Sequence, residues 1–385
     1  MSFLTAWTDM IYTKFQSNQQ KIAEFSFYAF YVLLIIAKSL GYNSGDLIYK
    51  ICFYVGVLFL LVKLVNTKYT LREILWIAFF LVIVFLIYFK LGDLSELLLL
   101  LSVVGMKNCN FSTIMKLTVI TRIAVTVTQL LLVSVGLMDA QQQLVDDGLN
   151  PIREVYALGW TKPNLAFLGG FLAVVVFLYV FYEKLNIWYF LGTMLPMVLL
   201  YKVTYCRTGI IVYFFLWVLI IVDKAIRYKK IYWLYCLAYV VGYVISFLAM
   251  HFYQGTYGYM QTINQVFNGR IDIMNTYYKT VGLSLFPRDV SIFSFNLNRI
   301  IDNLYMSLTI TSGIIVGVLF VVLLTRCMYT LYHKKCYKEI IFMVIFAVYA
   351  ILEEFPLNPS LNPFMLLLGV LLYKDKVIIR EKTSE

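Results

Sequence analysis

The side chains best suited to chemistry on an anionic ligand are four arginines in the second half of the sequence: Arg207, Arg270, Arg288 and Arg299. A guanidinium group stays charged in a protein, and its planar set of N–H donors matches the oxygens of a phosphate. Arg207 directly precedes the apolar run 208–222, so we expect it in the first turn of a transmembrane helix. The free N–H groups and the dipole of such a helix end favour an anion. The pattern predicts binding of phosphate or pyrophosphate.

Each of these arginines also has a structural alternative. Arg207 can extend to the lipid headgroups while its stem stays in the membrane. Arg270 follows Gly269, which lets the backbone turn sharply or approach a ligand, and it can pair with Asp272 in its own loop. A further arginine, Arg122, lies inside an apolar segment, where a cation should face the bundle interior or a wet cavity. A structural ion pair and a ligand contact are both compatible with that position.

The acidic residues that a reaction would need lie beside two later apolar segments. Asp302 and Asn303 open one such segment, where they either cap a helix or, in the case of the carboxylate, accept a proton from an attacking hydroxyl. Glu353 and Glu354 form a second acidic pair. Adjacent residues cannot face each other as a catalytic carboxylate dyad does. We therefore interpret Glu353 and Glu354 as solvated loop charges.

The elements that must position these residues are membrane helices. Of the 385 residues, 62% are hydrophobic and only 14% are charged, which excludes an ordinary soluble domain. A helix needs about 20 apolar residues to cross a hydrocarbon core about 30 Å thick. We therefore predict an all-α integral membrane protein with about twelve transmembrane helices, at residues 23–40, 47–65, 71–89, 94–106, 114–137, 164–182, 187–202, 208–222, 231–252, 302–325, 339–352 and 359–373.

The lysines and arginines between these segments predict the orientation. They are about twice as frequent in one set of alternate connections as in the other, and the richer set is expected on the cytoplasmic side. Both termini are then cytoplasmic, and the two long connections, 138–163 and 253–301, are outside. We expect residues 1–385 to form a single polytopic domain, with short helices in the larger outer loop 253–301 before the tenth span.

Several other classes of protein lack their signatures in this sequence. None of the six cysteines forms a CxxC pair, so neither a zinc site nor a disulfide framework is indicated. The net charge of +11 is spread between apolar segments and does not form the basic face of a nucleic-acid-binding domain. Fingerprints of P-loop, Rossmann, zinc-protease and serine-hydrolase sites are also missing. We expect no metal, no cofactor and no nucleic acid.

Four short motifs give the chain a resemblance to a known family. In their order, spacing and predicted outer placement, the sequence resembles the Wzy-type polysaccharide polymerases and the related O-antigen ligases. The motifs are Gly159-Trp160-Thr161-Lys162-Pro163-Asn164, Cys206-Arg207-Thr208-Gly209, Gly269-Arg270, and Asp302-Asn303-Leu304-Tyr305 followed by Gly313. Two positions depart from the family pattern. Lys162 replaces a histidine, which weakens the resemblance to the ligases, and Cys206 replaces a serine.

The resemblance implies a reaction between two lipid-linked glycans in the bacterial cytoplasmic membrane. A hydroxyl of one undecaprenyl-pyrophosphate-linked repeat unit would attack the anomeric carbon of a second glycan with inversion, and the lipid pyrophosphate would leave. Arg207 and Arg270 would stabilise the departing charge. A base is optional for such an activated donor, and Asp302 is the candidate for it. The expected substrate-binding residues are Arg122, Lys162, Asn164, Arg299, Asn303 and Tyr305.

Other functions fit the same pattern of spans. A flippase or other transporter of lipid-linked oligosaccharide also needs about a dozen helices, though many transporters show related halves and broken helices at the midplane. A ligase-like transfer to another acceptor and a peptidoglycan-type glycosyltransferase are closer in chemistry. A membrane scaffold would leave the outer arginines unexplained. A polymerase could act alone or beside a flippase and a chain-length regulator.

Overall fold

The computed structural model describes residues 2–145, 153–226, 229–256, 258–290 and 300–379. Within them, eight helices are long and apolar enough to cross a membrane, which makes the chain a predominantly helical, multi-pass membrane protein. Seven of them correspond closely to predicted spans. The bounds predicted for the tenth span, 302–325, are wrong, because residues 304–312 form a short α-helix and a π-helix and the membrane-length helix runs from Ile314 to His333. The eight helices are α1 (Ser2–Ser39, apolar over Asn18–Ser39), α2 (Leu47–Val65), α3 (Leu71–Leu91), α5 (Phe111–Ser134), α6 (Pro163–Val180), α7 (Ile187–Thr204), α8 (Arg207–Ala225) and α14 (Ile314–His333).

The four remaining predicted segments adopt other forms. Segment 94–106 is the eleven-residue helix α4 (Ser95–Gly105), and segment 339–352 is the sixteen-residue helix α15 (Tyr337–Leu352). Segment 231–252 is interrupted, and segment 359–373 is a turn followed by a 3₁₀ helix and a short α-helix. Their elements are η2 (Lys229–Ile231), α9 (Tyr232–Tyr235), α10 (Ala238–Phe252), η6 (Pro363–Leu368) and α16 (Gly369–Tyr373).

The last predicted segment, 359–373, can be irregular because other parts of the same chain surround it. Pro363 begins η6, and Asn362 accepts a hydrogen bond from the backbone N–H of Phe364. The side chains that follow, from Phe364 to Leu367, are almost completely buried. Non-helical backbone at membrane depth is tolerated where protein surrounds it. The expectation of a regular α-helix at 359–373 is therefore wrong in its local geometry.

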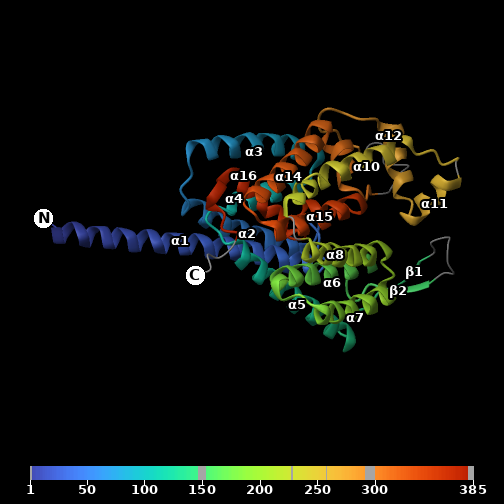
Figure 1. Cartoon of the computed structure of the whole chain (residues 1–385), viewed down its shortest axis with the longest axis horizontal. Coiled ribbons are helices and arrows are strands. Elements are labelled where there is room, and N and C mark those ends of the chain that lie inside the picture. Colours follow the sequence, from blue (N-terminus) through green and yellow to red (C-terminus); the bar gives the residue numbers. More distant parts are fainter. Residues whose placement is uncertain (1, 146–152, 227–228, 257, 291–299, 380–385) are drawn as a thin grey trace.

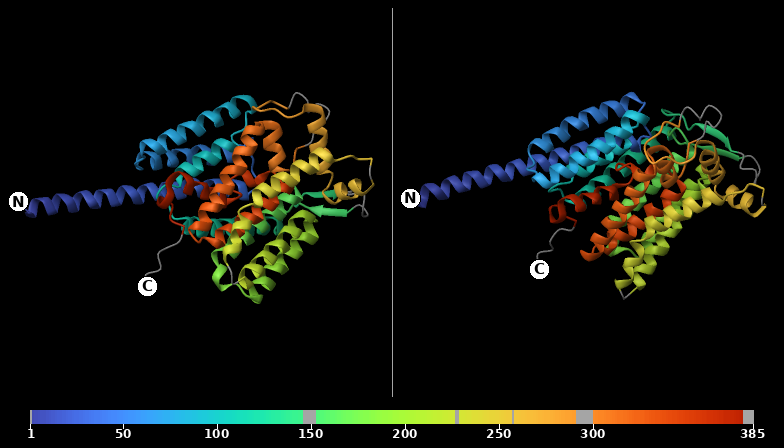
Figure 2. Two further views of the ribbon diagram at one scale, coloured as in Figure 1. Left: turned by 45° about the horizontal axis from the view of Figure 1, so that its top comes forward. Right: turned by 90° about the horizontal axis from the view of Figure 1, so that it is seen from above.

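The long connections lie together at one end of the bundle (Figures 1 and 2). We call this the loop end; it carries α11 (Gly258–Val266), α12 (Arg270–Val281) and the antiparallel hairpin of β1 (Gln142–Val145) and β2 (Arg153–Tyr156). The hairpin departs from the all-α expectation. The opposite end, where α1 projects from the bundle and η7 (Lys374–Lys376) lies, is the terminal end. The other short helices are η1 (Tyr182–Lys184), η5 (Phe355–Leu357), α13 (Leu304–Ser307) and the π-helix η4 (Leu308–Ser312).

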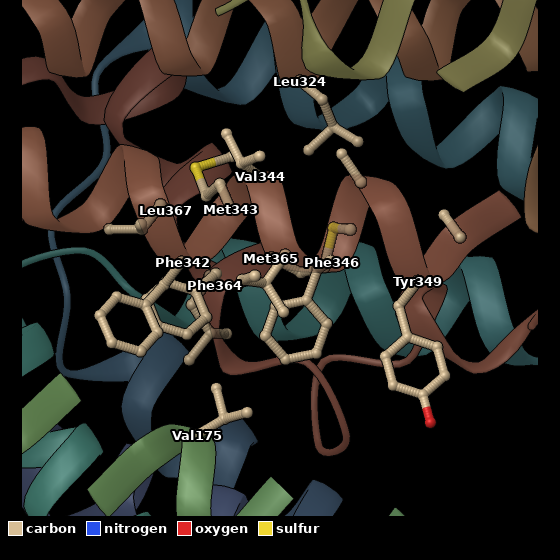
Figure 3. Packing of buried hydrophobic residues seen from close by; sticks show 14 of the residues in the cluster. Val175, Leu324, Phe342, Met343, Val344, Phe346, Tyr349, Phe364, Met365 and Leu367 are labelled. Carbon is tan, nitrogen blue, oxygen red and sulfur yellow. The ribbon is translucent and has the colours of Figure 1, made fainter. Parts of the chain in front are cut away.

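Helix α15 lies in the centre of the core. Apolar side chains cover it on nearly all sides, as expected for a helix buried in a bundle. The ring of Phe342 stacks on that of Phe364 from η6, with centroids 5.6 Å apart, and Phe346 packs against the same ring (Figure 3). The loop end of α15 therefore has a fixed position, and this helix end carries Glu353.

Gly313 separates the π-helix from α14. Its φ angle is +94°, and a Cβ atom built there would lie 2.7 Å from the backbone oxygen of Leu285. Only glycine tolerates both that backbone conformation and the close approach. This junction fixes the short segment that begins at Asp302.

Candidate functional site

Arg207 lies in the first turn of α8 at the loop end, as the sequence predicts. Its Nη2 atom donates a hydrogen bond of 2.5 Å to Oδ1 of Asn268, in the loop between α11 and α12. Its guanidinium carbon lies 5.9 Å from the centre of the Tyr205 ring, at the limit of a cation–π contact. The structure therefore joins the Arg207 motif to the residue that precedes Gly269 and Arg270.

A second arginine, Arg153 of β2, reaches the same tyrosine. Its guanidinium carbon lies 4.5 Å from the centre of the Tyr205 ring. Tyr205 ends α7 in a left-handed conformation, with φ +51°, so its side chain sits in the tight turn between α7 and α8. Sequence reasoning missed Arg153 because 54 residues separate it from Arg207 and no motif marks the hairpin.

Arg270 begins α12 and forms an ion pair with two carboxylates from other elements. Its Nη2 atom lies 2.6 Å from Oε1 of Glu353, and its Nε atom lies 3.5 Å from Oδ2 of Asp302. The Arg270 side chain is only 6% exposed, whereas Glu353 and Asp302 are 22% and 39% exposed. Among the ion pairs of the described residues, Arg270 has none with Asp272, the alternative partner that the sequence predicted. Arg270 is thus buried, whereas the two carboxylates that it pairs with remain accessible from outside the protein.

Burial and charge shift the pKa of Glu353 in opposite directions. Burial raises the pKa of this carboxyl, the cation of Arg270 lowers it and the nearby Asp302 raises it, which leaves a pKa of about 7. A carboxyl with such a pKa is well matched to accepting a proton near neutral pH. The interpretation of Glu353 and Glu354 as solvated loop charges is therefore wrong, since Glu354 is also held, by a 2.6 Å hydrogen bond from Ser307.

These contacts define one connected group, which we call the arginine–carboxylate cluster: Arg153, Tyr205, Arg207, Asn268, Arg270, Asp302 and Glu353. Five separate parts of the chain supply it. It offers two exposed or half-exposed guanidinium groups on one side and two accessible carboxylates on the other. This arrangement suits a substrate that has both an anionic group and a hydroxyl that loses a proton.

Lys162 and Asn164 lie at the start of α6, close to the start of α8. Lys162 is the residue before the first turn, Pro163 begins the helix, and both Lys162 and Asn164 are exposed. The two helix starts are neighbours because Gly209 in α8 has no side chain and the ring of Phe167 fills that space. The structure thus brings the first two motifs to the same end of the bundle.

Asn303 and Tyr305 are engaged inside the bundle. Asn303 donates to Oγ of Ser246 and to the backbone oxygen of Ile351, and it caps α13 by accepting from the N–H of Met306. Tyr305 donates to the backbone oxygen of Ala347. Both side chains are about 1% exposed. These contacts give them a packing role in place of the expected contact with substrate.

The remaining arginines fall into three situations. Arg122 is buried in α5, faces the interior as expected, and donates to Oγ of Ser39 and to the backbone oxygen of Ser360 beside a cavity of about 40 Å³. Neither Ser39 nor Ser360 belongs to the cluster. Arg288 binds the last carbonyls of α12, those of Val281 and Gly282. Arg299 lies outside the described residues.

No metal-binding group is formed by His, Cys, Asp and Glu in the parts of the chain that the structure describes. Comparison of the chain with protein-family models, with curated proteins and with solved structures finds no match. The fold and the site therefore define a multi-pass membrane protein with an arginine–carboxylate cluster at the loop end.

Proposed function

We propose that this protein polymerises lipid-linked oligosaccharide repeat units by inverting glycosyl transfer at the outer face of the bacterial cytoplasmic membrane. The observation that carries the proposal is the cluster itself. It places a helix-start arginine and an arginine-held carboxylate pair within one connected group, drawn from three of the four motifs that resemble Wzy-type polymerases.

The two arginines have different roles in this proposal. Arg207 is half-exposed at the start of α8, donates a hydrogen bond to Asn268 and lies near the Tyr205 ring. Arg207 and the N-terminus of α8 together attract the pyrophosphate. Arg153, which also contacts the Tyr205 ring, supplies a second cation. Arg270 is buried and already faces two carboxylates, so it positions these carboxylates and does not bind the anion directly.

The reaction then needs one proton transfer and one displacement. The acceptor hydroxyl gives its proton to Glu353 or Asp302 as its oxygen attacks the anomeric carbon of the donor sugar. The bond between that carbon and the pyrophosphate oxygen breaks, and the undecaprenyl pyrophosphate leaves with the bonding electron pair. Arg207 and Arg153 stabilise the charge that develops on this leaving group. The bond to pyrophosphate is already activated, so orientation of the two lipids supplies much of the rate enhancement.

The test is polymer formation by the purified full-length chain in proteoliposomes. The substrate is the host's undecaprenyl-pyrophosphate oligosaccharide, and the product is resolved on a gel. We expect a ladder of added repeats with the unaltered protein and its loss with Arg207→Ala, since removal of one such donor costs roughly 100- to 1,000-fold in rate.

Lys279→Ala is the matched control, because Lys279 is an exposed cation of α12 at the same end of the bundle. It should leave the ladder unchanged. A folded protein that makes no ladder, but moves labelled lipid across the bilayer, would overturn the proposal and identify a flippase. Transfer of a single glycan to a different acceptor would identify a ligase.

A further inference from the structure

A second site is visible along α3 and α14, and none of its lining residues belongs to the arginine–carboxylate cluster. Helices α3, α4, α14 and α16 enclose a groove of about 430 Å³, within the range of about 300–1,000 Å³ that ligand pockets usually have. Leu, Ile, Val and Phe side chains form most of its lining, and the half-exposed Trp76 of α3 stands at its edge. We call it the α3 groove. Its walls suit a hydrocarbon chain.

Two arginines line the same end of the α3 groove. Arg72 stands in the first turn of α3, and Arg326 stands in the last two turns of α14, so both lie toward the terminal end. Both side chains are exposed. Among the described residues, neither guanidinium has an ion pair with a carboxylate, in contrast to Arg270.

The opposite end of the groove is acidic. Glu96, in the first turn of α4, is the third charged residue of the lining, and it accepts a hydrogen bond of 3.2 Å from Ser312 of the π-helix. The groove thus has a cationic end, an apolar middle and an acidic end. An amphipathic anion with one long chain fits it in one direction only, with its charge at Arg72 and Arg326.

We propose that the α3 groove binds one anionic phospholipid, with an acyl chain between α3 and α14 and its phosphate between Arg72 and Arg326. Basic pockets between membrane helices are suited to anionic headgroups. A neutral phospholipid would gain only the apolar contacts. A polyprenyl pyrophosphate entering with its charge at the loop end would meet Glu96 instead. This site is separate from the proposed polymerase chemistry, and it remains if that chemistry is disproved.

The experiment compares two lipids on the purified full-length protein in a neutral detergent. Phosphatidylglycerol and phosphatidylcholine with identical acyl chains are titrated, and bound lipid is counted by native mass spectrometry. We expect one phosphatidylglycerol to bind about 30-fold more tightly than phosphatidylcholine, on the basis of about a fivefold contribution from each of the two arginines. The variant Arg72→Gln with Arg326→Gln should abolish that preference.

Two further variants separate the groove from general surface charge. Lys68→Gln with Lys335→Gln removes two exposed cations at the terminal end that do not line the groove, and it should keep the preference. Leu99→Trp fills the apolar middle while both arginines remain, and it should weaken binding of both lipids. Gel filtration of each variant reports its folding.

Three results would overturn the proposal. The first is equal affinity for the two lipids in the unaltered protein. The second is a preference that survives Arg72→Gln with Arg326→Gln, or that disappears equally with the Lys68 and Lys335 changes. The third is unchanged binding in folded Leu99→Trp. If the double arginine variant does not fold, the comparison of Leu99→Trp with the unaltered protein still decides whether the groove is the site.

Discussion

Two groups of paired charges stand at opposite ends of this bundle, and they are built differently. At the terminal end, Lys107 forms an ion pair with Glu73, and both side chains are sealed, with exposed fractions of 1% and 8%. At the loop end, Arg270 is equally buried, but its partners Glu353 and Asp302 remain 22% and 39% exposed. Of these two groups, only the one at the loop end leaves carboxylate oxygen atoms accessible.

The terminal group also satisfies its cations within the protein. Lys107 donates to the backbone oxygen of Lys68 and lies 4.7 Å from the centre of the Tyr69 ring. The neighbouring Lys63 donates to the backbone oxygen of Lys107, at 2.6 Å. Such a closed network fixes the ends of α2 and α3, and its charged groups are not available to a ligand. The two groups therefore differ in the accessibility of the carboxylate partners and not in the burial of the cation.

The largest expected effect is on stability at the terminal end. Lys107→Ala would leave the Glu73 carboxylate buried without its partner, which costs about 3–5 kcal/mol. Unfolding of the detergent-solubilised protein should therefore begin at a clearly lower temperature. Lys334→Ala, which removes an exposed ion pair with Asp375 at the same end, should have no measurable effect. Equal unfolding temperatures for Lys107→Ala and the unaltered protein would contradict the structural role of this group.

The second effect concerns catalysis and its dependence on pH. Glu353→Gln should reduce the rate of polymerisation about 100-fold, which is the lower range for loss of a general base. Since the pKa of Glu353 is about 7, the carboxylate that accepts the proton predominates above that value. The rate of the unaltered protein should therefore rise as pH increases through about 7 and then level off.

Rates measured between pH 5 and 9 with a fixed lipid composition would reveal that step. It should be missing from Glu353→Gln and present in Glu354→Gln, whose carboxyl is held by Ser307 and does not belong to the cluster. A step that persists unchanged in folded Glu353→Gln would assign the proton transfer to another group, with Asp302 as the next to examine.

The third effect distinguishes a packing residue from a substrate contact within a single motif. Asn303→Ala removes the cap of α13 and two further buried hydrogen bonds, so we expect a loss of about 1–3 kcal/mol in stability. Activity per folded molecule should change little. If Asn303→Ala instead keeps its unfolding temperature and loses polymerisation, the side chain contacts substrate and the packing assignment is wrong.

The smallest effect is expected for the arginine that the sequence did not reveal. Arg153→Ala removes one charge-assisted contact at an exposed position, worth about 1.5 kcal/mol, or roughly a tenfold loss in kcat/KM. Combined with Arg207→Ala, it should lose less than the sum of the two separate effects, because both guanidiniums act on the same anion. Strictly additive effects would show that Arg153 acts elsewhere.

The sequence predicted the parts of the fold that depend on local pattern. Apolar runs of sufficient length indicate eight helices, and the start of α8 at Arg207 follows from the polar residues that precede its apolar run. The sequence predicted the irregular segments 231–252 and 359–373 less well. The form of segment 359–373 depends on Pro363, on the cap from Asn362 and on burial by distant helices, which hydropathy does not report.

The candidate site also divides into residues that the sequence indicated and residues that it did not. Residue types and motifs indicated Arg207, Arg270 and Asp302, since guanidinium and carboxylate groups at predicted loop positions suggest their own chemistry. They did not indicate Glu353, because a carboxylate in a polar loop looks solvated until its neighbours are known. Nor did they separate Asn303, which is buried, from Asp302, which is accessible.

By itself, the sequence determined that this is a multi-pass membrane protein and where most of its helices begin, because helix length and polarity are local properties of the chain. Only the tertiary structure decided which charges face each other. Arg270 and Glu353 are 83 residues apart, and the hydrogen bond between Arg207 and Asn268 spans 61 residues. Ion pairs and hydrogen bonds need contact distances of about 4 Å or less, so packing of the helices, and not the order of the residues, sets the charge and the accessibility of the site.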